Sequence, residues 1–171
     1  MPRDTRERLI HAAHELFRRY GFHEVGIDQI IEKVGVTKST FYNHFESKDQ
    51  IVLEVLKWRD ATWAGALRET LKKHAGDSPR ERLLALFDCL DEVWGATGYH
   101  GCLFTRAAAE FPVPHHPIHV VVGEHVKAVK GELRDMGAAA WAKDPEALAN
   151  DLLLLIAGAY ALSQMGGATS A

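Results

Sequence analysis

The stretch that decides the fold is IDQIIEKVGVTKSTFYNHF, residues 27–45. Its first part, residues 27–34, places Ile and Val at helical spacings, and Gly35 then marks a tight turn. Thr37 can cap a second short helix that runs through Tyr42 to Phe45. Two short helices joined by such a turn have the spacing of a helix-turn-helix, which serves either to recognise DNA or merely to connect packed helices.

The second of these helices is polar on all but a narrow face. Only Phe41 and Phe45 are clearly apolar, and the other side chains offer hydroxyl, amide, ammonium and imidazole groups. Groups of this kind bond to base edges and to phosphate oxygens. The residue types therefore indicate a DNA-contacting surface on Thr37, Lys38, Ser39, Thr40, Tyr42, Asn43 and His44.

Helix signals also dominate the rest of the chain, and no segment alternates like a strand of useful length. Upstream, a helix opens near Asp4 or Thr5, with Glu7 as capping partner, and ends at Gly21. Downstream, a capping box at residues 47–50 opens a long helix that runs to about residue 73. Further helices are expected near residues 79–95, 102–111, 117–142 and 145–162, so the predicted fold class is all-α.

Composition and charge limit the classes of protein to which this chain can belong. The 171 residues are 47% hydrophobic and 25% charged, as in ordinary globular proteins. Their net charge is −3, so any nucleic-acid binding must be local. Two cysteines are too few for a disulfide scaffold, and the apolar run at residues 152–162 is about half the length of a membrane span. With a charged N-terminus lacking an apolar stretch, we expect a cytoplasmic protein without membrane contact.

The motif LxxAAxxLFxxxGF at residues 9–22, followed by IxxxxGVTKSTFYxHFxSKD at residues 30–49, resembles the DNA-binding domain of the TetR family of bacterial transcriptional regulators. The resemblance covers roughly the first fifty to fifty-five residues. It departs at residues 25–26, where family members usually have Thr or Ser and this chain has Val-Gly. The hydroxyl that would cap the second helix is therefore missing.

The resemblance implies a homodimer that binds a palindromic operator in double-stranded DNA and releases it when a small inducer binds. Residues 1–48 would form the three-helix DNA-binding domain, and residues 49–171 the helical domain for ligand binding and dimerisation. Thr40 and Asn43 would reach into the major groove, while Lys48 would pair with a phosphate. The full implied set is Thr37, Lys38, Ser39, Thr40, Tyr42, Asn43, His44 and Lys48.

Two further sets of residues follow from the expected C-terminal domain. Dimer helices need apolar seams, which we assign to Val122, Val126, Val129, Leu133, Leu148, Leu152, Leu155, Ala159 and Leu162. A hydrophobic or aromatic inducer needs flat apolar walls, which we assign to Trp58, Trp63, Phe87, Leu90, Trp94, Phe104, Phe111 and Tyr160. Burial in the core of one subunit is the alternative for each of these residues.

The sequence leaves three other functions to compare with DNA binding. A metal or thiol sensor of the same fold would use residues such as Cys89, His100, Cys102, His115, His116, His119 and His125, although we expect no metal or cofactor. A helical interaction module that no longer binds DNA is a second alternative. An enzyme is not expected, because the sequence has no Gly-rich phosphate loop, nucleophile elbow or His-Glu-x-x-His motif.

Overall fold

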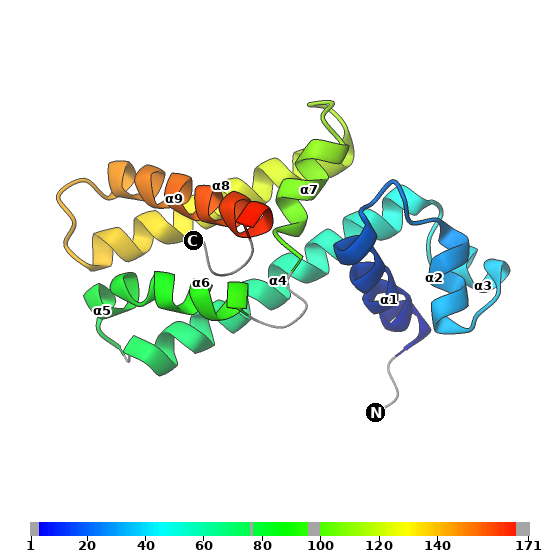
Figure 1. The fold of residues 1–171 in the computed structure, drawn as a ribbon, viewed down its shortest axis with the longest axis horizontal. Coiled ribbons are helices and arrows are strands. Elements are labelled where there is room, and N and C mark those ends of the chain that lie inside the picture. The colour runs from blue at the N-terminus through cyan, green and yellow to red at the C-terminus, as the bar shows by residue number, and fades with distance from the viewer. Residues whose placement is uncertain (1–3, 76, 96–99, 167–171) are drawn as a thin grey trace. The chain divides into compact units, whose positions relative to one another are not determined.

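The computed structural model describes residues 4–75, 77–95 and 100–166. Within these ranges the chain forms helices and connecting loops without a β-strand (Figure 1), which confirms the predicted all-α class. The helices are α1 (Thr5–Tyr20), α2 (Ile27–Val34), α3 (Lys38–Tyr42), α4 (Lys48–Ala75), α5 (Pro79–Leu84), α6 (Leu86–Gly95), α7 (Leu103–Glu110), α8 (Pro117–Ala139) and α9 (Pro145–Gly166).

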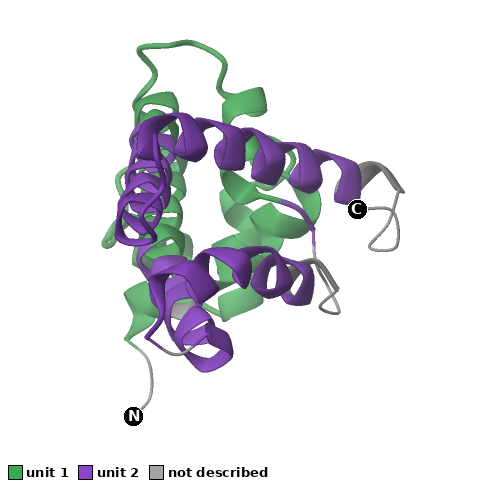
Figure 2. Ribbon diagram, turned by 90° about the vertical axis from the view of Figure 1, so that its left-hand side faces the viewer, with its two compact units in different colours: residues 1–60, 102–123 green, residues 61–101, 124–171 purple. Residues whose placement is uncertain are grey.

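The helices group into two compact units (Figure 2). Unit 1 consists of Met1–Asp60 together with Cys102–Gly123, and unit 2 of Ala61–Gly101 together with Glu124–Ala171. Unit 1 therefore joins the three N-terminal helices to α7 and to the start of α8. The predicted boundary after residue 48 separates a DNA-binding domain from a ligand-binding and dimerisation domain. It is a division by function and stays a prediction.

Helix α1 is held by an apolar stripe whose members Leu9, Ala13 and Phe17 are fully buried. Gly21 ends the helix with φ 95° and donates its N–H to the Phe17 carbonyl at 3.0 Å. At the other end Asp4 occupies the N-cap position, but its side chain makes no capping hydrogen bond. The predicted cap from Asp4 is therefore wrong, while the predicted end of the helix is confirmed.

The helix-turn-helix forms where the sequence predicts it. Gly35 adopts the left-handed conformation, with φ 74° and ψ 40°, and its N–H reaches the Ile31 carbonyl at 2.9 Å. The Thr37 hydroxyl caps α3 by accepting the Thr40 N–H at 3.2 Å. Helix α3 ends at Tyr42 and not at Phe45, because the N–H of His44 bonds to Phe41 in a tighter turn, at 2.9 Å.

Other predicted caps form in modified ways. At Gly26 no side chain caps the first turn of α2, but the reciprocal hydrogen bond of a capping box is present, since the Gln29 side-chain oxygen accepts the Gly26 N–H at 2.7 Å. At the start of α4 the Ser47 hydroxyl accepts the Gln50 N–H at 3.2 Å. The Gln50 side chain returns to the N–H of Glu46 and not to that of Ser47, so only half of the predicted capping box is present.

In unit 2 the single helix expected over residues 79–95 is divided. Ser78 caps α5 as predicted, accepting the Glu81 N–H at 3.4 Å. Ala85, with φ −73° and ψ −7°, then separates α5 from α6. The break does not divide the apolar side: Leu86 and Leu90 lie in the core of unit 2, and Leu83 and Phe87 pack against it, whereas Leu84 is 65% exposed.

The last helix, α9, is buried on one face and exposed on another. Its start is capped by Asp144, whose carboxylate accepts the Ala147 N–H at 3.0 Å. Ala149, Leu152 and Ile156 pack in the core of unit 2. The exposed fractions of Leu154, Leu155 and Leu162 are 72, 59 and 55%. Residues 145–163 are long and apolar enough to cross a membrane, by length and composition only.

Candidate nucleic-acid interface

Helix α3 is anchored by two buried phenylalanines and presents its polar side chains outward. Phe41 is fully buried and Phe45 is 1% exposed, and both rings lie in the core of unit 1. Their ring centroids are 5.5 Å apart. This anchoring leaves five predicted DNA contacts exposed and Thr40, His44 and Lys48 half-buried; the exposed ones are Thr37, Lys38, Ser39, Tyr42 and Asn43.

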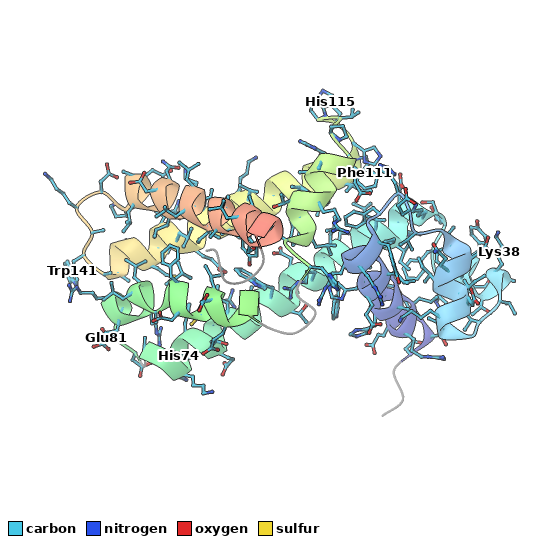
Figure 3. All side chains as sticks on the ribbon, in the orientation of Figure 1. Lys38, His74, Glu81, Phe111, His115 and Trp141 are labelled. Atoms are coloured by element: carbon cyan, nitrogen blue, oxygen red, sulfur yellow. The ribbon has the colours of Figure 1, made fainter. Side chains whose placement is uncertain are left out.

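Lys38 lies on the exposed side of the helix-turn-helix (Figure 3). Its ammonium group pairs with the Asp28 carboxylate of α2 at 3.2 Å. Both side chains are more than half exposed, so the pair contributes little stability and water competes with it. Lys38 can therefore exchange Asp28 for a phosphate oxygen at small cost.

Three other polar residues of the α3 segment make contacts within the helix-turn-helix. The hydroxyls of Thr37 and Thr40 lie 2.9 Å apart, within hydrogen-bond distance. The Tyr42 ring stands edge-on to Phe41, with centroids 5.5 Å apart, and is 48% exposed. These contacts restrict the side chains before any partner is bound, which lowers the entropy lost on binding.

Lys48 opens α4 beside the loop between α1 and α2. Its ammonium group donates a hydrogen bond to the His23 carbonyl oxygen at 3.2 Å. The sequence predicted that Lys48 pairs with a DNA phosphate. It did not predict the contact with His23, because nothing in the local pattern connects the two residues. The backbone of the loop thus holds a cation on the same unit that carries α3.

Arg6 and Arg8 of α1 form contacts with other helices of unit 1. The Arg6 guanidinium pairs with Glu54 of α4 and lies over the Phe45 ring, 5.4 Å from its centroid. Burial alone would raise the pKa of Glu54, but hydrogen bonds from Arg6 and Lys57 hold it below its ordinary value. Arg8 donates to the Val34 carbonyl at 2.7 Å, at the end of α2.

The residues predicted to line an inducer site are divided between the units. Trp58, Phe104 and Phe111 pack in or against the core of unit 1. Trp63, Phe87, Leu90 and Tyr160 gather around the core of unit 2. The side chain of Trp94 lies outside the described residues. The first group belongs to the core that also holds the helix-turn-helix, whereas the second group belongs to a separate core.

The residues predicted for the dimer interface differ in exposure. The core of unit 1 buries Val122, and the core of unit 2 buries Leu133 and Leu152. These three side chains are covered by their own subunit. Partly buried against the core of unit 2 are Val129, Leu148 and Ala159. Three members are exposed, namely Val126 at 42%, Leu155 at 59% and Leu162 at 55%.

Two of the histidines considered as metal ligands have partners within the chain, and one of the cysteines is buried. His119 Nδ1 lies 2.8 Å from the Phe111 carbonyl oxygen, and His116 Nε2 lies 3.5 Å from the Asp49 carboxylate. Cys89 is buried, and its burial, followed by the charges of Glu92 and Asp88, raises its thiol pKa. No group of three His, Cys, Asp or Glu side chains that could hold a metal occurs in the described part of the chain.

Comparison with known proteins identifies the family. The sequence model described as "Bacterial regulatory proteins, tetR family" matches residues 9–55. The transcriptional activator FasR of Mycolicibacterium smegmatis is 34% identical over 94 residues, which cover 53% of this chain and 43% of that protein. The transcriptional repressor NemR of Escherichia coli K12 is 30% identical over 108 residues, covering 63% of this chain and 54% of NemR. The matched segment thus spans about half the length of these curated relatives.

A solved structure extends the likeness to nearly the whole chain. A Streptomyces avermitilis protein assigned to the TetR regulators superposes with a TM-score of 0.81 and 30% identity, covering 96% of this chain and 88% of that one. The chain belongs to the TetR family. Its relatives FasR and NemR are named as transcriptional regulators, in agreement with the expectation that the chain is not an enzyme.

Proposed function

We propose that this TetR-family chain is a repressor that binds a palindromic operator as a homodimer and is released by a small hydrophobic or aromatic inducer. One observation carries the DNA-binding part of the proposal. Phe41 and Phe45 fix α3 in the core, so that its hydroxyl, amide and ammonium groups face outward together. An outward polar helix of this kind can enter the major groove and bond to base edges.

The apolar surface of α9 supports the homodimer. Leu154, Leu155 and Leu162 are each more than half exposed, whereas monomers seldom leave so many large apolar side chains of one helix in water. Small residues at 157, 158 and 161 are exposed on the same helix and would let a second helix approach closely. A second copy would cover this surface with the same surface, as two-fold symmetry requires.

The aromatic cluster of unit 2 supports an inducer of matching chemistry. Trp63, Phe87 and Tyr160 are partly buried and pack against one core. Flat apolar rings with a hydroxyl and an indole N–H suit a hydrophobic ligand that carries a polar group. The inducer would release DNA by binding more tightly to a conformation in which the two α3 helices no longer match successive major grooves.

The experiment that tests this function is selection of genomic fragments by the purified protein at about 0.15 M salt, where specific contacts must outcompete counterions. Recovery of a palindrome whose half-sites lie about one helical turn apart would support the proposal. A reporter gene placed behind that palindrome should then be silenced by the protein. Retention of fragments without a common sequence would contradict the proposal, and retention of no fragments would favour an interaction module that no longer binds DNA.

A further inference from the structure

Two side chains of α7, one helical turn apart, form hydrogen bonds with the backbone at the end of α1 and in the loop that follows it. The Glu110 carboxylate accepts two consecutive backbone N–H groups, that of Phe22 at 3.1 Å and that of His23 at 2.7 Å. The Arg106 guanidinium donates to the Phe17 carbonyl at 3.3 Å. We call the contacts of Arg106 and Glu110 with residues 17–23 the α7 clasp. All of its members lie in unit 1.

The clasp is complementary in charge and in shape. Arg106 places a cation at the C-terminal end of α1, where the helix dipole is negative, and Glu110 places an anion on two N–H groups beyond that end. Gly21 makes room for it, because a Cβ atom at residue 21 would lie 2.8 Å from Glu110 Oε1. A larger residue would push the carboxylate away from the loop.

His23 connects the clasp to the DNA-contacting surface. Its N–H is held by the Glu110 carboxylate, and its ring Nε2 lies 2.7 Å from the Glu110 carbonyl oxygen. The ring also packs against Phe111, with centroids 4.9 Å apart, at the end of α7 (Figure 3 labels Phe111). The backbone carbonyl oxygen of His23 accepts the hydrogen bond from Lys48. One loop residue thus joins α7 to a cation of the proposed interface.

We infer that Glu110 is a positioning residue for DNA binding: it fixes the backbone of residues 21–23, so that the His23 carbonyl holds the Lys48 ammonium in place for a phosphate. This inference rests on the proposed DNA-binding function and adds a residue outside the segment that matches the family model. Glu110 itself contacts the loop through backbone N–H groups. It acts on DNA only through His23 and Lys48.

A double-mutant cycle tests the inference in the full-length protein. The probe is a labelled duplex of random sequence, about 30 base pairs long, which is enough for two half-sites one turn apart. Affinity is measured against salt for wild type, Glu110→Gln, Lys48→Ala and the double variant. Glu69→Gln is the matched control, since it removes the same charge from an exposed position on α4 in unit 2. Thermal unfolding checks that each variant is folded.

We expect Glu110→Gln to weaken binding about three- to tenfold and to lower the salt slope by about one, as Lys48→Ala does, because both remove one phosphate contact. In the Lys48→Ala background Glu110→Gln should change affinity less than about twofold, since the two residues act in series. The control should bind like wild type. If Glu110→Gln fails to fold, Glu110→Asp replaces it, because a shorter carboxylate cannot reach both N–H groups.

Two results would overturn the inference alone: wild-type affinity for Glu110→Gln, or an equal loss in both backgrounds, which indicates a general structural role. A wild-type protein that does not bind the duplex even at low salt, where phosphate contacts alone give measurable binding, would instead refute the proposed function, and the inference with it. Wild-type binding by Lys48→Ala would remove the assigned role of Lys48 and the inference with it, because Glu110 acts on DNA only through that lysine. The salt slopes distinguish these cases, because only a lost phosphate contact changes them.

Discussion

Gly21 lies directly beneath the carboxylate of Glu110, and a methyl group at residue 21 would stand 2.8 Å from its Oε1 atom. Two segments far apart in the sequence are therefore fitted to each other at the end of α1. The same relationship extends into the core, where Leu103, Phe104 and Ala107 of α7 pack with the N-terminal helices. The DNA-binding unit of this chain is completed by residues that lie well beyond its helix-turn-helix.

Gly21→Ala should destabilise the protein more than Gly35→Ala. Both glycines have positive φ, but residue 35 is left-handed with open space around its Cβ position, so alanine there should cost about 1 kcal/mol. At Gly21, φ 95° and ψ 169° form a conformation that essentially only glycine adopts, and the clash with Glu110 is added, so we expect about 2–3 kcal/mol. Denaturant unfolding measures both, and the opposite order would contradict the fit between Gly21 and Glu110.

A fragment ending at residue 60 should not fold cooperatively. It contains all of α1, α2 and α3 but lacks Leu103, Phe104, Phe111 and Ile118, which are at most 8% exposed in the same core. Losing these partners would expose the apolar side of α1 and α4 to water, at a cost larger than the net stability of a small domain. Circular dichroism on heating is the measurement, and a sharp transition near that of the whole chain would contradict the expectation.

His14 should make the protein less stable as the pH falls from about 6.5 to about 4. Its ring is 8% exposed, packs against Trp58, and its Nε2 atom lacks a hydrogen-bond partner among the described residues. Burial first, and the charges of Arg18 and Arg59 second, lower its pKa from 6.5 to about 4. The unfolded chain binds the proton at the higher pH, so stability is lost through this window, by at most about 3 kcal/mol.

The His14→Leu variant tests that expectation. Leucine needs no hydrogen bond, so the variant should be about 1 kcal/mol more stable than wild type at pH 7 and should lose less stability toward pH 4. His115→Leu is the matched control, because His115 is exposed at the connector between α7 and α8 (Figure 3). If the two variants follow the same pH curve, His14 is not the group responsible.

Tyr42→Phe should weaken operator binding about fivefold without lowering the melting temperature. The substitution removes one phenolic hydroxyl, a group worth about 1 kcal/mol in a hydrogen bond, and leaves the ring contact with Phe41 intact. Tyr20→Phe is the control, because Tyr20 is equally exposed, at 49% against 48%, but lies in the last turn of α1. Equal losses in the two variants would argue against a specific role for Tyr42.

Leu155→Glu should convert the dimer to a monomer. A carboxylate placed on the exposed face of α9 would be buried opposite its symmetry mate, where the two like charges repel each other. Leu84→Glu provides the comparison, since Leu84 is 65% exposed on α5 in the same unit. Light scattering after size-exclusion chromatography gives the mass. A wild-type monomer, or a dimeric Leu155→Glu variant, would refute the assigned interface.

Local patterns predicted most of the helical structure. Gly21, Gly35 and Thr37 act through their own backbone or through neighbours within four residues, so the sequence alone revealed the turns and the cap they form. Phe41 and Phe45 were recognised as the buried face of α3 because every other side chain on that helix is polar. The break at Ala85 was missed, since alanine favours helix and gives no local stop signal.

Contacts between distant segments could not be predicted in the same way. Glu110 reads as an ordinary polar residue at the end of a helix, and only the folded chain brings it to Phe22 and His23. Helical periodicity marked Leu133 and Leu155 alike as apolar, but it does not say which face meets the subunit core. The structure buries Leu133 and exposes Leu155, a choice set by the packing of α8 and α9 in unit 2.

The most direct test of the account is the ratio of the dissociation constants for a scrambled duplex and for the palindrome selected from genomic DNA, measured with the full-length protein at about 0.15 M salt. We expect the palindrome to bind at least about a thousandfold more tightly, as sequence-specific regulators do. Asn43→Ala should reduce that ratio about tenfold, because an amide bonded to a base edge is lost. Equal affinity of the wild-type protein for the two duplexes would contradict the claim that α3 reads a DNA sequence.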